Sequence, residues 1–319
     1  MPWWYEERRF LSIFMTFHVV TFYKIAHVKD SAKLAREIER ISTKENLSGT
    51  FFSTPQGVNA TLSGSLQGLD QIVHLLQNSY ALNFTPAWSV AKKNPFKRFK
   101  IKLKDELLPL EGDFDPVISR GKHVKPDNWN ELISDPDTTV LDVRNNYESD
   151  IGGFKNSVIP GTDNFIDFPD YVESNLDAVK NKKIAMFCTG GIRCEIASSY
   201  LISKGFDEVY QLEGGVLNYL ESVEVKDQLW EGECFVFDER VSVNKALEEG
   251  NFIQCFGCRR PLTPDEVNSE YYQKGVSCRF CYKESSNSDK ERFAQRQKQI
   301  ELAEQRGHKH MGVSAKQTK

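Results

Sequence analysis

The stretch Ile184-Ala-Met-Phe-Cys-Thr-Gly-Gly-Ile-Arg-Cys-Glu195 decides the fold of the central part of the chain. Its first four residues predict a short buried strand, and Ile196 to Lys204 has the apolar spacing of an amphipathic helix closed by Gly205. A strand, a tight glycine loop and a helix N-terminus therefore follow one another directly. Backbone N–H groups in such a loop turn inward and the helix end adds positive potential, so an anion is favoured inside it.

Cys188 opens this loop and is predicted to be the catalytic residue, because the loop favours its thiolate form. The loop continues through Thr189, Gly190, Gly191 and Ile192. Arg193 ends it and adds a fixed positive charge. The alternative is an inert buried cysteine, but it leaves the two glycines and the arginine without a purpose. Cys194 either resolves an oxidised Cys188 as a disulfide or is a small helix residue facing the core.

Three further segments, together with this loop, resemble the successive signatures of a rhodanese domain. They are Leu141-Asp-Val-Arg144, Gly152-Gly-Phe-Lys-Asn-Ser-Val-Ile-Pro-Gly161 and Gly205-Phe-Asp-Glu-Val-Tyr-Gln-Leu-Glu-Gly-Gly215. The alternation of strands and helices predicts an α/β domain with a mainly parallel sheet over residues 125–228. The resemblance implies that Asp142 and Arg144 lie under the loop and steady it; a surface ion pair is the alternative. Related phosphatases have a loop one residue longer, which argues against phosphatase activity.

Residues 16–110 are predicted to form a separate ferredoxin-like α+β domain. The expected strands are Phe17–Ala26, Gly49–Ser53, Gly57–Ser63 and Phe99–Leu103, and the expected helices are Ser31–Ser42 and Ser65–Gln77. Their β-α-β-β-α-β order is that of the ferredoxin-like fold.

A basic stretch at the end of this domain is a candidate RNA-binding surface. Seven of the thirteen residues from Lys92 to Lys104 are basic, and Phe96 and Phe99 lie among them. A stripe of one charge sign with aromatic residues is typical of a surface that binds a nucleic-acid backbone, although a solvated face is the alternative. The residues predicted to contact RNA are Lys97, Arg98, Lys100 and Lys102.

The C-terminal part contains two Cys-x-x-Cys pairs, Cys255-Phe-Gly-Cys258 and Cys278-Arg-Phe-Cys281, separated by nineteen residues. Four cysteines at this spacing predict a closed, structural zinc site, with free thiols as the alternative. The segment 229–285 is expected to form this four-cysteine domain. The remaining parts are an extension at 1–15, a linker at 111–124 and a polar tail at 286–319, expected to be a solvated helix.

Composition limits the other possibilities. A chain of 319 residues exceeds what one core usually organises, and a net charge of -4 argues against a protein coated in positive charge. The use of cysteine fits a reducing cytoplasm rather than a secreted disulfide framework. The apolar stretch from Phe10 to Ile25 contains His18 and Lys24 and lacks a cleavage site, so neither a signal peptide nor a membrane span is expected.

The whole chain resembles the bacterial rhodanese-domain tRNA uridine hydroxylases over about residues 16–285. The resemblance rests on Gly57-Val-Asn-Ala-Thr-Leu-Ser-Gly64, on the Cys188 loop and on the four cysteines. It implies that tRNA is the partner, that molecular oxygen is a co-substrate and that 5-hydroxyuridine is made at the wobble position with Cys188 as the active-site residue.

The residues themselves leave alternatives open. The thiolate of Cys188 could add to C6 of uracil, with Arg193 and the loop amides steadying the enolate, or it could carry a persulfide as in sulfurtransferases. A non-enzymatic RNA-binding adaptor is a third class. The six histidines show no iron-binding spacing and the chain has no dinucleotide fingerprint, so flavin, haem and nicotinamide are not indicated. The oligomeric state is not predicted.

Overall fold

A computed structural model describes residues 17–179 and 181–306. They form two compact units that meet in the sequence between Pro109 and Leu110. Each unit has hydrophobic clusters of its own, as expected for a chain too long for a single core. The predicted extension at 1–15 and the end of the polar tail at 307–319 lie outside the described residues.

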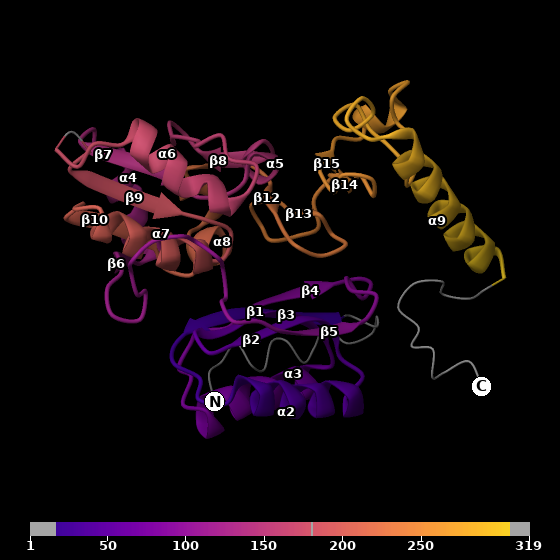
Figure 1. Ribbon diagram of the computed structural model, residues 1–319, viewed down its shortest axis with the longest axis horizontal. Helices are drawn as coiled ribbons and strands as arrows, with labels where there is room; N and C mark the ends of the chain where they lie inside the picture. The colour runs from indigo at the N-terminus through magenta and orange to yellow at the C-terminus, as the bar shows by residue number, and fades with distance from the viewer. Residues whose placement is uncertain (1–16, 180, 307–319) are drawn as a thin grey trace. The chain divides into compact units, whose positions relative to one another are not determined.

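The first unit is a five-stranded sheet with two helices on one face (Figure 1). Its elements are β1 (Phe17–Ile25), α2 (Ser31–Lys44), β2 (Ser48–Thr54), β3 (Gly57–Gly64), α3 (Leu66–His74) with a π-helical extension (Leu75–Ser79), β4 (Ala87–Ala91) and β5 (Phe99–Leu103). The strand order is β4-β1-β3-β2-β5, and its first four strands are the sheet of a ferredoxin-like fold. The predicted fold of this domain is confirmed.

One strand of this sheet differs from the prediction. The strand that completes the ferredoxin-like sheet is β4, which pairs antiparallel with β1. The stretch Phe99–Leu103, expected in that place, instead forms β5 and pairs parallel with β2 at the opposite edge. Only Ala91 of β4 is buried, so this half-exposed edge strand lacks the alternation of apolar residues by which strands are recognised.

Alternation along β5 separates an apolar from a basic face. Phe99 and Ile101 pack against the core, whereas Lys100 and Lys102 are exposed. Side chains alternate across a strand, so the two lysines share the face that points away from the helices. The structure therefore gives the basic stretch a defined face of the sheet.

The second unit is built around a four-stranded parallel sheet with the order β6-β10-β9-β7. In chain order, the α-helices and β-strands of this unit as far as α8 are β6 (Lys122–Val124), α4 (Pro126–Ser134), β7 (Thr138–Asp142), α5 (Asn146–Ser149), β8 (Gly152–Phe154), α6 (Phe168–Asn175), β9 (Lys183–Phe187), α7 (Ile192–Ser203), β10 (Glu208–Leu212) and α8 (Gly215–Ser222). Then follow β11 (Trp230–Gly232), β12 (Cys234–Phe235), β13 (Ser242–Val243), β14 (Ile253–Gln254), β15 (Pro261–Leu262) and α9 (Asn287–Gln305). The predicted parallel α/β sheet is confirmed.

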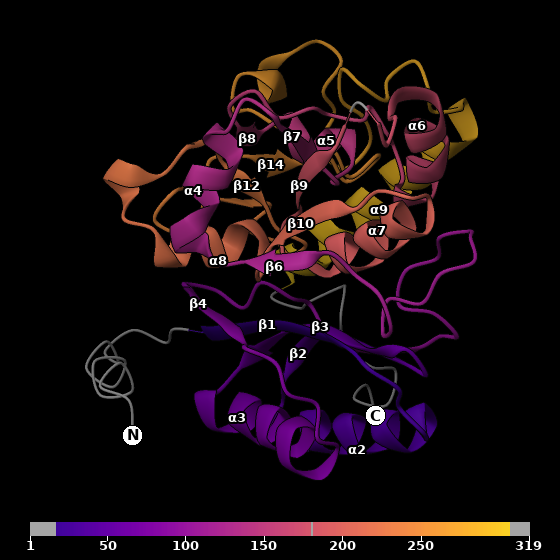
Figure 2. The same cartoon turned by 90° about the vertical axis from the view of Figure 1, so that its left-hand side faces the viewer.

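Helices cover both faces of this sheet (Figure 2). Helices α4 and α8 pack on the face to which Phe187 points, and α6 and α7 pack on the face of Met186. Burial of both faces explains why β9 reads as a continuous apolar run. Its carboxyl end leads directly to Cys188, at the edge where open parallel sheets bind their ligands.

Segments on either side of the predicted rhodanese region also belong to this unit. Within 111–124, expected as a linker, β6 joins the sheet and Phe114 contacts Tyr200 edge to face at 5.8 Å. After residue 228, Trp230 is fully buried and lies edge to face on Phe154, with ring centroids 5.2 Å apart. Across the part of the chain that the structure describes, no helix combines the length and apolarity needed to span a bilayer.

Candidate active site

The Cys188 loop connects the end of β9 with the start of α7 at Ile192. The N–H of Gly191 donates a hydrogen bond to the Cys188 sulfur at 3.1 Å. Gly191 has a φ of 96°, a left-handed conformation that favours glycine, and it immediately precedes the helix. The predicted succession of strand, glycine loop and helix N-terminus is present, with the sulfur on its inner side.

The surroundings of Cys188 favour its thiolate. Burial raises the pKa of the thiol, but the side chain of Cys194, the charge of Arg193 and the N–H groups of both residues outweigh it and lower the pKa to about 6. Cys188 is only 1% exposed. At neutral pH Cys188 is therefore mainly a thiolate in a site closed to bulk water.

Cys194 is a neutral partner of this thiolate. Burial, and then hydrogen bonding to Cys188, raise the pKa of Cys194 well above its ordinary value. The side chain is fully buried in the core cluster between the sheet and α7. It thus combines a core position with a hydrogen bond to the reactive sulfur.

Helix α8 supports the loop from behind. The N–H groups of Val216 and Leu217 donate to the carbonyls of Cys188 and Thr189 at 3.0 and 3.1 Å. A Cβ atom on Gly215 would lie 2.6 Å from the Cys188 carbonyl oxygen, a distance that side chains essentially never adopt. The paired glycines that end the third rhodanese signature therefore allow this close approach.

Arg193 is held by a buried carboxylate that the sequence did not reveal. Its Nη1 and Nη2 donate to the Oε1 and Oε2 atoms of Glu148 at 2.5 and 2.6 Å. Glu148 is fully buried, and although burial would raise its pKa, the charge of Arg193 lowers it. The positive charge expected to be available for an oxyanion is instead balanced by an ionised glutamate.

Asp142 and Arg144 act on the loop through Glu148. The pair is buried, with Arg144 Nη2 and Nε donating to Asp142 at 2.6 and 2.9 Å, so the alternative of a surface ion pair is wrong. Arg144 also donates to the carbonyl oxygens of Glu148 and Gly152, at 3.1 and 2.5 Å. The pair fixes α5, and Glu148 of α5 in turn contacts Arg193 and the hydroxyl of Thr189.

A sequence signal for Glu148 existed. The Asn145 N–H donates to the Glu148 side chain at 3.2 Å, in a capping box that starts α5. An Asn-x-x-Glu pattern predicts such a helix start. It does not predict that the same carboxylate reaches across to another element, because that contact depends on tertiary structure.

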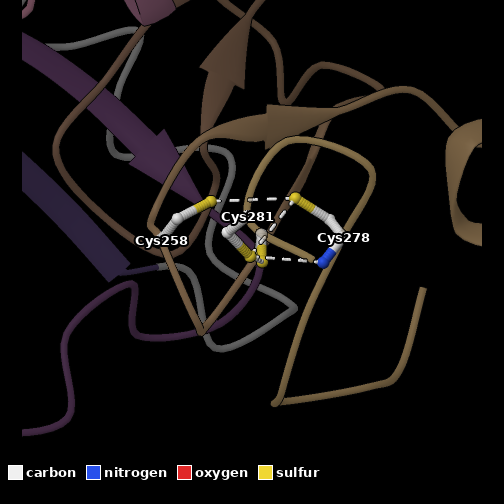
Figure 3. Close-up of side chains that lie close together, drawn as sticks. Cys258, Cys278 and Cys281 are labelled. Carbon is white, nitrogen blue, oxygen red and sulfur yellow. Dashed lines mark hydrogen bonds between the residues drawn. The ribbon is translucent and has the colours of Figure 1, made fainter. Parts of the chain in front are cut away.

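The four cysteines of the C-terminal segment come together (Figure 3). Their sulfur atoms all lie within 4.8 Å of one another, with separations of 3.9 Å for Cys255 and Cys281, 3.7 Å for Cys258 and Cys278, and 3.8 Å for Cys278 and Cys281. A tetrahedral zinc site with Zn–S bonds of about 2.3 Å requires sulfurs about 3.8 Å apart. The donor set thus fits a metal such as zinc.

Helix α9 is attached to this cluster. Arg296 Nη2 donates to the carbonyl oxygens of Phe256 and Gly275, at 2.7 and 3.1 Å, and these belong to the segments that carry the two cysteine pairs. Burial lowers the pKa of Arg296. The first part of the predicted polar tail is therefore a helix tied to the cysteine cluster.

The predicted RNA-binding residues lie on the first unit. Lys100 and Lys102 are in β5, and Lys97 and Arg98 precede it. Lys102 and Lys104 approach the ring of Phe52, with Nζ 4.8 and 5.9 Å from its centroid. Cations and an aromatic ring thus share this face of the sheet.

Residues 125–222 match the family model of the rhodanese-like domain. The chain is therefore a rhodanese-domain protein. Residues 17–107 match the UPF0176 acylphosphatase-like domain. The two domains in this order are the architecture of the UPF0176 family.

Several solved structures are similar to about a third of this chain. A rhodanese-like domain from Anabaena is 20% identical over 34% of this chain and 78% of that one, with a TM-score of 0.29. A rhodanese-like domain protein from Staphylococcus aureus is 26% identical over 31% of this chain and 90% of that one, with a TM-score of 0.26. A rhodanese-related protein from Thermoplasma volcanium is 27% identical over 31% and 91%, with a TM-score of 0.25.

Proposed function

We propose that this protein hydroxylates the wobble uridine of tRNA to 5-hydroxyuridine, with molecular oxygen as co-substrate and Cys188 as nucleophile. The domain architecture shared with the UPF0176 family supports a tRNA substrate. The observation that carries the proposal is the bidentate pair between Arg193 and Glu148 beside a thiolate. It supports the choice of a neutral substrate over an anion.

The charge balance of the loop gives the reason. With Arg193 paired to ionised Glu148, the loop offers a thiolate, backbone N–H groups and no uncompensated cation. A thiosulfate or phosphate anion would meet a negative sulfur without a free positive charge to offset the repulsion. A uracil ring is uncharged and meets no such barrier. Because the sulfur is buried, the base must leave its stack to reach it.

The chemistry then follows from nucleophilic addition. The Cys188 sulfur forms a bond to C6 of uracil, and the electron pair of the C5–C6 double bond moves to C5 and the enolate oxygen. C5 bonds to one oxygen atom of O2, and the other leaves as water with two protons and two electrons from a cellular two-electron reductant. Loss of the C5 proton and cleavage of the S–C6 bond restore the ring and the thiolate. The loop N–H groups stabilise the enolate.

A persulfide sulfurtransferase is the second candidate, because the same thiolate can attack thiosulfate and release sulfite. The N–H group of Gly191 would serve a persulfide as well as a thiolate. The pairing of Arg193 with Glu148 disfavours this reaction, since the donor is a dianion.

The deciding experiment is mass spectrometry of tRNA nucleosides from cells that lack the protein and carry either the wild-type gene or Cys188→Ala. We expect 5-hydroxyuridine only with the wild type, only in the presence of oxygen, and with label from isotopically labelled oxygen. Unchanged 5-hydroxyuridine together with altered thiolated nucleosides would instead assign the sulfurtransferase activity.

A further inference from the structure

Phe237, in the second unit, is a phenylalanine whose ring lies at the surface rather than in the hydrophobic core. Its side chain is 59% exposed, and no other phenylalanine or tryptophan among residues 17–179 and 181–306 is exposed to a similar degree. Burying a phenylalanine side chain in an apolar core is normally favourable. A ring kept at the surface therefore calls for a reason in its surroundings.

Those surroundings are the Cys188 loop. The guanidinium carbon of Arg193 lies 5.9 Å from the centroid of the Phe237 ring. Arg193 ends the loop that Cys188 begins, and its charge lowers the pKa of that sulfur. Phe237 thus borders the predicted active site, although it is 49 positions further along the chain than Cys188.

The ring of Phe237 packs against a second aromatic ring. Phe235, which is buried, contacts Phe237 edge to face with ring centroids 5.2 Å apart. Tyr147 also contacts Phe235 edge to face, with ring centroids 5.3 Å apart, and directly precedes Glu148. Three rings therefore connect the exposed face of Phe237 with α5, which carries the partner of Arg193.

The turn that presents Phe237 is closed by hydrogen bonds and contains a strained residue. It joins β12 to β13, and buried Asp238 accepts from the backbone N–H and Nε of Arg240 at 3.0 and 2.9 Å. Val241 has a φ of 65°, an outlier for a β-branched residue, within a three-residue turn closed by Ser242 N–H to Arg240 carbonyl at 2.7 Å. Strain of this kind persists where surrounding structure imposes it, often at ligand sites.

We propose that Phe237 is a stacking platform for the nucleobase next to the reacting uridine. This inference rests on the proposed function, which supplies an RNA whose target base must be drawn out of its stack. A flat ring at the border of the loop can replace the lost base neighbour, since every base has a π face and stacking on an aromatic side chain tolerates any sequence. The nearby guanidinium of Arg193 and the buried Phe235 fix the plane against which the base would lie.

The test uses the full-length protein and an anticodon stem-loop RNA hairpin with uridine at the wobble position. We expect Phe237→Ala to weaken binding roughly 5- to 150-fold, the range for loss of one stacked base, and Phe237→Trp to restore it. The matched control is Tyr271→Ala, another exposed aromatic, whose ring lies in a tilted contact with Tyr282 of the cysteine segment. The control should bind as the wild type does.

A double-mutant cycle identifies the stacked base. An abasic nucleotide is placed first on one side of the wobble uridine and then on the other. On the side of the stacked base, this change should lower the affinity of the wild type for the hairpin but hardly change the affinity of the Phe237→Ala variant. The thiolate midpoint of Cys188, about 6, should stay unchanged in Phe237→Ala, which excludes a collapsed loop.

The outcomes separate this inference from the proposed function. The stacking role would be overturned if Phe237→Ala bound the hairpin as tightly as the wild type does. It would also be overturned if the affinity lost through Phe237→Ala and the affinity lost through each abasic nucleotide simply added. A loss of self-association in Phe237→Ala with unchanged RNA binding would overturn it as well and assign the ring to a contact between copies. Ring-dependent binding without formation of 5-hydroxyuridine would support the stacking role and overturn the proposed activity.

Discussion

At the scale of single residues, Glu148 determines the electrostatic character of the Cys188 loop. Arg193 stabilises the thiolate by its charge, and Glu148 pairs with both terminal nitrogens of the same guanidinium. The sulfur therefore gains a low pKa while the loop as a whole carries no excess positive charge. This combination suits a nucleophile that attacks an uncharged ring.

The ionisation of Cys188 gives the first prediction. Its pKa of about 6 lies below the ordinary 9.0, so the thiolate should form as the pH rises through about 6. This step is measured by following the ultraviolet absorbance of thiolates against pH in the wild type and subtracting the same titration of Cys188→Ser. Because the pKa of this thiol is 9.0 in the unfolded chain, its lowered pKa stabilises the folded state above pH 9.0, and this contribution is lost as the pH falls through about 6.

The variant Cys194→Ala removes a hydrogen bond to the Cys188 sulfur and should move the midpoint of the thiolate step upward. A thiolate step near pH 9 in the wild type would contradict the assignment.

The buried ion pair gives the second prediction. Glu148→Gln leaves Arg193 charged, buried and uncompensated, which should lower the free energy of unfolding by about 3–5 kcal/mol in denaturant titrations. It should also lower the pKa of Cys188, because a negative neighbour is removed. Glu173→Gln is the control: its pair with Lys204 is exposed to solvent, and removal of such a pair changes stability little. Equal effects of the two changes would contradict the role of Glu148.

Much of this site could be predicted from the residues in one stretch. Cys188, the glycines and Arg193 are adjacent in the sequence, so local geometry was enough to bring them together. Glu148 and Phe237 come from distant elements, and Arg144 acts through a carbonyl of α5 rather than on the loop directly. Contacts of this kind depend on the tertiary fold and have no local pattern.

At the scale of elements, strand prediction succeeded where burial was regular. The run Ile184–Phe187 is buried on both faces, and β9 extends over Lys183–Phe187. The failure was β4, whose residues are half-exposed, and the consequence was that β5 was assigned to the wrong edge of the sheet. Sheet order is set by pairing across the chain, which periodicity along one strand does not specify.

The four-cysteine segment gives the third prediction. Around its cysteine cluster, the described part of this segment has the short strand pair of β14 with β15, so a metal should contribute much of its stability. Freshly reduced protein should contain about one zinc per chain, and Cys278→Ser should lose it while Cys234→Ser, in the other core, retains it. Chelation should increase hydrogen exchange in β14, β15 and the start of α9 before the Cys188 thiolate step changes. Metal-free reduced protein with the same exchange would show that free thiols suffice.

At the scale of the whole molecule, the chain divides its predicted tasks between two compact units. The reactive thiolate belongs to the unit that begins at Leu110. The basic stretch from Lys92 to Lys104 belongs to the unit that ends at Pro109. The overall charge of -4 makes general attraction to RNA unfavourable, so we expect a local cationic face to supply any contacts to phosphates. Reactivity at Cys188 and affinity for tRNA should therefore be separable by mutation.

The last prediction tests that separation. Replacement of Lys97, Arg98, Lys100 and Lys102 by Gln should weaken tRNA binding and flatten its salt dependence, by up to about 0.9 in slope for each phosphate that is no longer neutralised. The Cys188 thiolate step should stay at about 6, because no residue of the basic strand is among the groups that set it. The control replaces Lys33 and Arg40, exposed cations on α2, and should leave the slope unchanged. If the slope is the same in all three proteins, the phosphates are held elsewhere, and Arg296 is a poor candidate because its guanidinium already bonds two carbonyls of the cysteine segment.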